Sequence, residues 1–176
     1  EGPDGYYELS IRRKPGGFVS NYIFDNWQPG TLISATGPHG DCVYSPLRDT
    51  KNIVAVAGGT GITPFRSMMK QFARCEPDMH LTLLYGCRDP EDDLFAGELG
   101  ALCAEHPDRL KRCNTYEDAC GQALRQGFLD ADFIGCNVED AGEKTYFICG
   151  PVAMYDFLKK EFPKLGVRER KQTRYE

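Results

Sequence analysis

The chain has 176 residues, of which 41% are hydrophobic and 27% are charged, a balance typical of a soluble globular protein with enough apolar side chains for a core. Its formal net charge of −5 argues against nucleic acid or an anionic membrane surface as the main partner. No apolar run approaches the roughly 18 residues that a membrane span needs, and the first residues, "EGPDGYYE", do not resemble a secretory signal, so we expect a cytoplasmic protein.

Strand-like segments and turns dominate residues 1–48. "YYELSIRRK" alternates imperfectly and "GTLISATG" is a β-branched run, while "PGG", "QPG" and "GPHG" are typical of turns between strands. Between the two strand-like segments, "SNYIFDNW" predicts a short helix with Ser20 as its N-cap. This part of the chain is therefore predicted to be β structure with one helix.

Strands and helices alternate from about Asp49 onward. The predicted strands are 53–57, 81–85, 110–115, 145–149 and a last one near 171–175. The predicted helices are 64–75, 94–105 and 151–162, with a short one near 120–126. Such alternation predicts a parallel sheet with helices on both faces, which is a doubly wound α/β fold.

The loop "GGTGITP", residues 58–64, joins the first of these strands to the first helix. Thr63 and Pro64 fit the N-cap and the first position of that helix, whose N-terminal N–H groups and positive dipole end would face an anion. Its glycines let the backbone approach a ligand closely. No Gly-Lys-Ser/Thr follows, and Pro64 stands where the usual dinucleotide fingerprint has its third glycine. These residues alone leave a phosphate loop and a structural turn both open.

Eight cysteines are spread along the chain without a C-x-x-C pair or a C-x4-C-x2-C run. Several lie in apolar segments, where a reduced thiol behaves as a small hydrophobic group. We expect neither a metal site nor a disulfide framework in this chain. Any iron–sulfur cluster would then belong to another domain or protein.

Three motifs in a fixed order carry a family resemblance. "GGTGITPFRSMM", "LLYGCRDPEDDLFAGEL" and "YFICGPVAMYDFLKKEF" together resemble the nicotinamide-binding domain of the ferredoxin–NADP reductase superfamily. Upstream, "GGFVSNYIFDNWQPGTLISATGPHGD" resembles the second half of that superfamily's flavin-binding barrel. The resemblance implies that 1–48 is the C-terminal part of an antiparallel FAD-binding β-barrel and that 49–176 is an NAD(P)-binding Rossmann-like domain. It also implies hydride transfer from a nicotinamide to FAD, followed by single-electron transfer to an acceptor.

The same resemblance implies a role for the glycine loop. In the superfamily this loop holds the pyrophosphate of the nicotinamide dinucleotide. The positions that take this role here are Gly59, Thr60, Gly61, Thr63 and Pro64.

Further nucleotide contacts are implied after the other strands. Cys149, Gly150 and Pro151 match the superfamily's Cys-Gly-Pro, where the cysteine lies beside the nicotinamide ring. A buried structural cysteine before a Pro-initiated helix is the alternative interpretation. Met154 could contact the ligand, or it could only pack its helix against the core. Arg88 could contact a ribose or a phosphate, or it could pair with the acidic residues of "DPEDD".

The flavin site implied by the resemblance is incomplete in this sequence. Gly17, Val19 and Ser20 match the segment that receives the flavin pyrophosphate at a helix start, although a simple Ser N-cap is the alternative. The superfamily's Arg-x-Tyr-Ser/Thr segment does not occur, and Glu176 matches a glutamate near the flavin without the aromatic residue that should follow it. We expect a fragment that binds FAD weakly or not at all and is inactive alone. A ferredoxin-like domain could follow it in the intact protein, as in some members of the superfamily.

The end of the third predicted strand favours NADH over NADPH. NADPH-using relatives have Ser-Arg there, whereas this chain has Glu117 and Asp118, which would repel a phosphate dianion and accept hydrogen bonds from ribose hydroxyls. Arg112 is a competing candidate for a phosphate contact.

Three functions remain open at this point. The first is a flavin-dependent reductase that passes electrons from NADH through FAD to an iron–sulfur or other acceptor, such as a ferredoxin-like domain or protein. The second is an electron-transfer subunit of a larger complex. The third is a non-catalytic nucleotide-binding or docking module, because a fold does not by itself fix a function.

Overall fold

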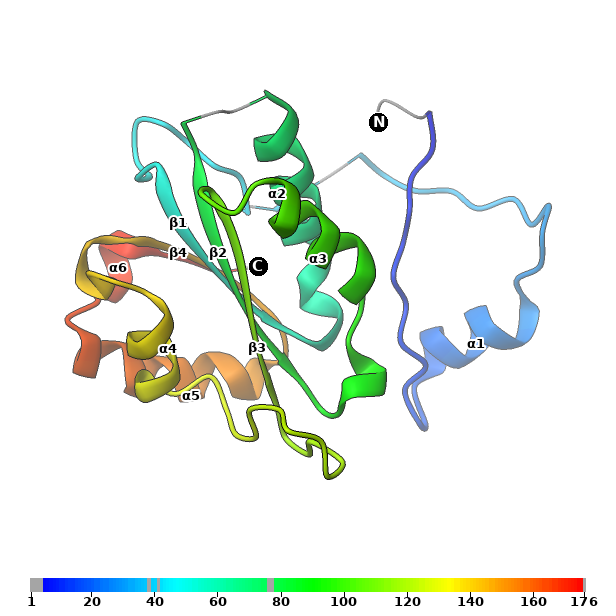
Figure 1. The fold of residues 1–176 in the computed structure, drawn as a ribbon. Coiled ribbons are helices and arrows are strands. Elements are labelled where there is room, and N and C mark those ends of the chain that lie inside the picture. The colour runs from blue at the N-terminus through cyan, green and yellow to red at the C-terminus, as the bar shows by residue number, and fades with distance from the viewer. Residues whose placement is uncertain (1–4, 38, 41, 76–77, 176) are drawn as a thin grey trace. The chain divides into compact units, whose positions relative to one another are not determined.

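The computed structural model describes residues 5–37, 39–40, 42–75 and 78–175 (Figure 1). The chain forms two compact units, residues 1–39 and residues 40–176. The division into domains at residues 48 and 49 stays a prediction.

The N-terminal unit contains helix α1, Phe18–Asn26, and no strand among its described residues. The strands predicted on either side of this helix are absent from the described part of the unit. A strand forms only when its backbone is hydrogen-bonded to a neighbouring strand, and no such pairing occurs among these residues. The helix also begins earlier than predicted, because Gly17 and not Ser20 is its N-cap. Ser20 lies in the first turn, where its hydroxyl accepts a hydrogen bond from the backbone N–H of Lys14 at 3.1 Å.

The second unit is built on a five-stranded sheet whose neighbouring strands are all parallel, in the order β3-β2-β1-β4-β5. The strands are β1 (Asn52–Gly58), β2 (His80–Cys87), β3 (Leu110–Tyr116), β4 (Thr145–Cys149) and β5 (Thr173–Tyr175). The structure confirms the predicted doubly wound α/β fold, and the first four strands match their predicted positions to within two residues at each end.

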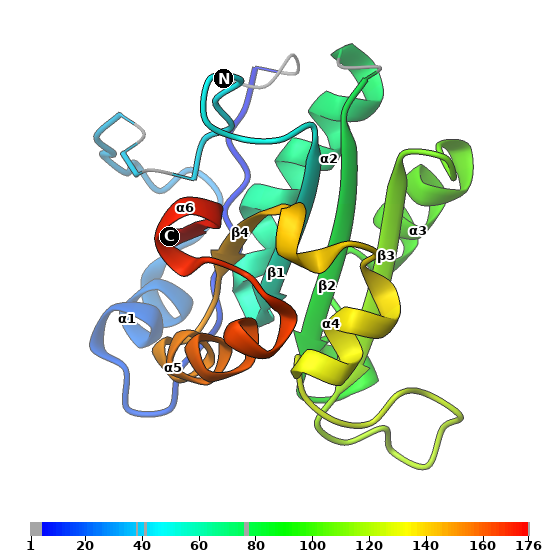
Figure 2. The same ribbon diagram turned by 90° about the vertical axis from the view of Figure 1, so that its left-hand side faces the viewer.

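Helices cover both faces of this sheet (Figures 1 and 2). Helices α2 (Thr63–Cys75) and α3 (Ala96–Glu105) lie on one face, and α4 (Ala131–Asn137) and α5 (Val152–Glu161) lie on the other. The short helix α6 (Glu169–Gln172) leads into β5. Four 3-10 turns complete the described elements: η1 (Gly59–Ile62), η2 (Pro90–Asp92), η3 (Ala141–Glu143) and η4 (Phe162–Leu165).

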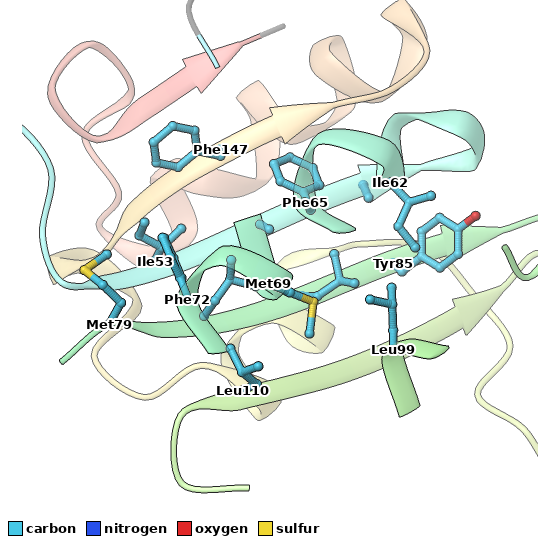
Figure 3. Close-up of a cluster of buried hydrophobic side chains, with 14 of the residues drawn as sticks. Ile53, Ile62, Phe65, Met69, Phe72, Met79, Tyr85, Leu99, Leu110 and Phe147 are labelled. Carbon is cyan, nitrogen blue, oxygen red and sulfur yellow. The ribbon is translucent and has the colours of Figure 1, made fainter. Parts of the chain in front are cut away.

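Each face of the sheet carries its own hydrophobic core. On the face of α2 and α3, the alternate residues of β1 and β2 pack against the apolar side of α2, which includes Phe65, Met69 and Phe72 (Figure 3). On the opposite face, Val54 and Val56 pack with residues of α4 and α5. A strand buried on both faces is expected to be a continuous apolar run, as "IVAVA" at residues 53–57 is.

The helix predicted near 120–126 does not form, and α4 appears instead after it. Cys120, Gly121 and Gly127 adopt positive φ values, of 50°, 72° and 143°, which a right-handed helix does not contain. Helix α4 has a recognisable start, since the Asp130 carboxylate accepts the backbone N–H of Phe133 at 2.7 Å.

A buried ion pair ties the last strand to the segment before the first. Two guanidinium nitrogens of Arg174 in β5 lie 3.0 and 2.7 Å from Oδ1 of Asp49, whose side chain is fully buried. Arg48 and the backbone N–H of Ser45 also donate to this carboxylate. Burial opposes ionisation of Asp49, but these donors hold its pKa below the ordinary value, so the carboxylate is ionised at neutral pH.

Candidate functional site

The order of the strands reverses between β1 and β4. From β1 the chain proceeds outward through β2 and β3, and then returns to place β4 on the other side of β1. In open parallel sheets, ligands bind in the crevice beyond the carboxyl ends of the strands at such a point. The glycine loop after β1 and the Cys149–Pro151 segment after β4 both lie there.

The two segments touch through glycine. A Cβ atom on Gly61 would lie 2.1 Å from the carbonyl oxygen of Cys149 and 2.8 Å from the backbone nitrogen of Gly150. A Cβ atom on Gly150 would lie 3.1 Å from the nitrogen of Gly58. The backbones therefore pack at distances that leave no room for a side chain, so these glycines have a structural role whatever the crevice binds.

The glycine loop continues directly into α2. Residues 59–62 form the 3-10 turn η1, and Gly59 has a φ of 55°, which glycine tolerates best. Thr63 is not the predicted N-cap, because it has helical φ and ψ values of −59° and −45° and its hydroxyl donates to the Thr60 carbonyl at 3.2 Å. The helical segment thus begins at Gly59, and its first N–H groups, which have no partner inside a helix, belong to the glycine loop itself.

Two tyrosines that the sequence did not single out hold these segments. The hydroxyl of Tyr85 in β2 donates to the carbonyl oxygen of Gly59 at 2.9 Å. The hydroxyl of Tyr155 in α5 accepts the N–H of Gly150 at 3.1 Å, and its ring packs edge-on against Tyr175 with centroids 5.4 Å apart. Pro151 is the N-cap of α5, in place of its predicted first helical residue.

Cys149 and Met154 lie at the crevice but differ in their surroundings. Cys149 ends β4 opposite Ala57 of β1, is half-buried, and packs against the core below α2. Met154 is half-buried, and its sulfur would lie 2.9 Å from a Cβ atom on Gly58 and 3.1 Å from one on Gly150. Its packing on these glycines supports the helix-packing interpretation without testing a ligand contact.

Acidic residues surround Arg88 at the outer carboxyl edge. Its guanidinium lies 2.9 Å from Asp89 and 3.2 Å from Asp92, and the hydrogen bond that it donates to Asp89 raises the pKa of Arg88. The backbone N–H groups of Glu117 and Asp118 donate to the carbonyls of Cys87 and Arg88, which extends the β2–β3 pairing. The predicted site residues Glu117 and Asp118 are thus beside Arg88, and both are exposed.

Arg112 does not lie at this edge. It sits in the middle of β3, opposite Leu83, with its side chain 10% exposed and its guanidinium paired with Asp93 and hydrogen-bonded to the Ala96 carbonyl. Asn114 and Tyr116 also donate to the carboxylate of Asp93, at 2.7 and 3.0 Å. Arg112 is therefore part of a buried network that fixes the loop after β2, and this position does not suit a phosphate contact.

In the N-terminal unit, Gly17 and the first turn of α1 form a second candidate anion site. A Cβ atom on Gly17 would lie 2.8 Å from the Ser20 hydroxyl oxygen and 3.0 Å from Cβ of Lys14. Val19 is exposed, and its N–H and that of Ser20 lie in the first helical turn. These features fit a pyrophosphate at a helix start. Glu176 lies outside the described residues.

Comparison with known proteins identifies the family. The model of the oxidoreductase NAD-binding domain matches residues 55–160, and that of the oxidoreductase FAD-binding domain matches residues 1–44. The chain belongs to the oxidoreductase NAD-binding domain family, within the ferredoxin–NADP reductase superfamily, and it carries an NAD-binding domain preceded by part of an FAD-binding domain. This confirms the resemblance seen in the sequence.

Several individual relatives are reductases by name. NADH-cytochrome b5 reductase 1 of Candida glabrata is 34% identical over 171 residues, which cover 92% of this chain and 58% of that protein. The ferredoxin–NAD(P)+ reductase component of the naphthalene 1,2-dioxygenase/salicylate 5-hydroxylase systems of a Ralstonia species is 29% identical over 164 residues, covering 93% and 49%. The crystal structure of the Amycolatopsis cytochrome P450 reductase GcoB superposes with a TM-score of 0.73 at 27% identity, covering 94% and 50%.

The chain thus spans about half the length of these relatives. Among the described residues, no group of three or more His, Cys, Asp and Glu side chains is arranged to hold a metal ion. No helix in the same residues is long and apolar enough to cross a membrane.

Proposed function

We propose that this chain is the nicotinamide-binding part of a flavin-dependent reductase that takes a hydride from NADH onto FAD and passes electrons to an iron–sulfur or other acceptor. The observation that carries the proposal is the passage of Gly61 over the Cys149–Gly150 peptide at the point where the strand order reverses. Family membership and the cytochrome b5 reductase and ferredoxin reductase relatives support it.

Different residues at the crevice bind different parts of the nucleotide. The N–H groups of Gly59 and Thr60 begin a helical segment and have no partner inside it, so these donors and the helix dipole stabilise a negatively charged pyrophosphate. Cys149 supplies shape and polarity beside the nicotinamide ring. Bound NADH supplies the hydride, and the protein's part is to orient the ring and exclude water from it.

The charge at the outer edge favours NADH over NADPH. Arg88 is already paired with Asp89 and Asp92, and Glu117 and Asp118 are exposed beside it. A second phosphate on the adenosine ribose would meet this acidic group, whereas a ribose with free hydroxyls can donate hydrogen bonds to it.

The direct test uses the full-length protein supplied with FAD. We expect NADH-dependent reduction of ferricyanide with a higher kcat/KM for NADH than for NADPH. Absence of reduction with both nucleotides would contradict the reductase function, and a preference for NADPH would contradict the cofactor assignment alone.

Replacing Glu117 by lysine is expected to shift the preference toward NADPH. The change removes one negative charge and adds a positive one, so the ratio of kcat/KM for NADPH to that for NADH should rise by about fivefold or more. Glu139 is a matched control, because it is also exposed but lines a pocket with the amino ends of β1 and β2. Glu139→Lys changes the net charge equally and should leave the ratio unchanged; an equal shift in both variants would refute the local effect.

A further inference from the structure

The hydroxyl of Tyr85 connects the glycine loop to the rest of the sheet. Tyr85 is completely buried on the α2 face of β2, near its carboxyl end (Figure 3). Its hydroxyl donates to the Gly59 carbonyl at 2.9 Å, and the Arg112 guanidinium lies 5.7 Å from the centroid of its ring. One side chain therefore bonds to the loop after β1 and contacts Arg112 of β3.

The loop after β2 is itself held firmly. Asp93, next to Leu94, is paired with Arg112 and accepts hydrogen bonds from Asn114 and Tyr116 of β3. Its side chain is only 9% exposed. The ring of Tyr85 therefore lies against a buried network, and its hydroxyl orients the glycine loop.

Burial raises the pKa of Tyr85 above its ordinary value, and nearby Cys87 and Asp93 add to this effect. The phenol consequently keeps its proton throughout the physiological pH range and remains a donor. Its acceptor, the Gly59 carbonyl, is fixed toward the interior of the protein.

The orientation of one carbonyl determines that of the next N–H. The peptide between Gly59 and Thr60 is trans, and in a trans peptide the C=O and N–H groups point in opposite directions. With the carbonyl held inward by Tyr85, the N–H of Thr60 faces the other way, toward the N-terminal end of the helical segment, where an anion is favoured.

We infer that Tyr85 is a positioning residue for the pyrophosphate: its hydroxyl holds the Gly59–Thr60 peptide so that the Thr60 N–H is directed at the ligand. This inference rests on the proposed function, since it deepens the same nucleotide site. Tyr85 acts through the glycine loop and does not touch the ligand.

The test compares two ligands that differ in the pyrophosphate. ADP-ribose contains it, and adenosine contains neither of its phosphates. In the intact protein, Tyr85→Phe should weaken the binding of ADP-ribose by about three- to tenfold, the equivalent of one hydrogen bond, and leave the binding of adenosine unchanged in calorimetric titrations.

Tyr146 provides a matched control. It too is completely buried, and its hydroxyl also donates to a backbone carbonyl, that of Ala141, at 3.0 Å, but it faces the opposite core. Tyr146→Phe should lower thermal stability about as much as Tyr85→Phe without changing the affinity for ADP-ribose. Equal weakening by both variants, equal weakening of ADP-ribose and adenosine, or no weakening by Tyr85→Phe would overturn the inference.

An NMR measurement on the unchanged protein tests the same inference if the Tyr85→Phe variant does not fold. The amide signal of Thr60 should shift in NMR spectra on addition of ADP-ribose and remain in place with adenosine. A bound ADP-ribose that leaves the Thr60 amide unchanged would refute the inference while preserving the proposed function. If ADP-ribose does not bind the unchanged protein at all, the proposed function itself fails.

Discussion

Gly61→Ala is expected to destabilise the second unit by about 3 kcal/mol and to lower kcat/KM for NADH by roughly tenfold or more. The added Cβ would lie 2.1 Å from the carbonyl oxygen and 2.5 Å from the carbonyl carbon of Cys149. Both are backbone atoms between the end of β4 and α5, so no side-chain rotation can relieve the overlap, and the two segments must separate. Urea unfolding measures the first effect and steady-state kinetics the second.

The matched control for this substitution is Gly100→Ala. Gly100 lies inside α3, is exposed, and has nothing within 4 Å of the position that a Cβ would occupy. Alanine there should stabilise the protein by about 1 kcal/mol through helix propensity. A Gly61→Ala variant as stable and as active as the Gly100→Ala variant would show that the two loops do not pack as closely as the structure indicates.

Asp49→Asn is expected to lower the free energy of unfolding by about 3–5 kcal/mol, because it leaves the buried charge of Arg174 without its counter-ion. The effect depends on pH with a definite sign. Since the folded pKa of Asp49 is below the unfolded value of about 3.9, its contribution is complete above about pH 5 and is lost as the pH falls through the folded pKa. The stability difference between the two proteins should therefore shrink in acid.

Asp78→Asn serves as the control for this pair. Asp78 pairs with Lys51 at 3.0 Å, but the two side chains are 75% and 63% exposed. Loss of this pair should cost between about 0 and 1 kcal/mol. Urea unfolding at pH 7 and at pH 3 gives the comparison, and a difference between Asp49→Asn and the unchanged protein that grows in acid would contradict the assigned sign.

Local sequence patterns were sufficient for the strands and the main helices of the second unit, but not for the N-terminal unit, where the predicted strands are absent among the described residues. The β-branched run before Gly58 and the 3.6-residue periodicity of Phe65, Met69 and Phe72 each identify one element without reference to the rest of the chain. The glycine loop and Cys149 could be placed together because the carboxyl ends of parallel strands share one edge of the sheet.

What the sequence did not reveal depends on contacts between distant residues. Tyr85 reads as one more apolar strand residue, and only the folded sheet brings its hydroxyl to Gly59. Arg112 was a phosphate candidate until the structure paired it with Asp93, 19 residues earlier. The expected caps at Ser20 and Thr63 were wrong because the helical turns begin upstream of them, at residues whose hydrogen-bond partners a single-sequence pattern does not specify.

The pairing of β1 with β4 sets the order in which this unit can fold. Strands β1, β2 and β3 and their helices α2 and α3 are contiguous in sequence, so their contacts close short loops. Ile53 meets Thr145, and Asp49 meets Arg174 across 125 residues, so these contacts close the longest loops and pay the largest closure entropy. We therefore expect the crevice between the glycine loop and Cys149 to form late in folding, with one edge of β1 unpaired and open to another chain until β4 docks.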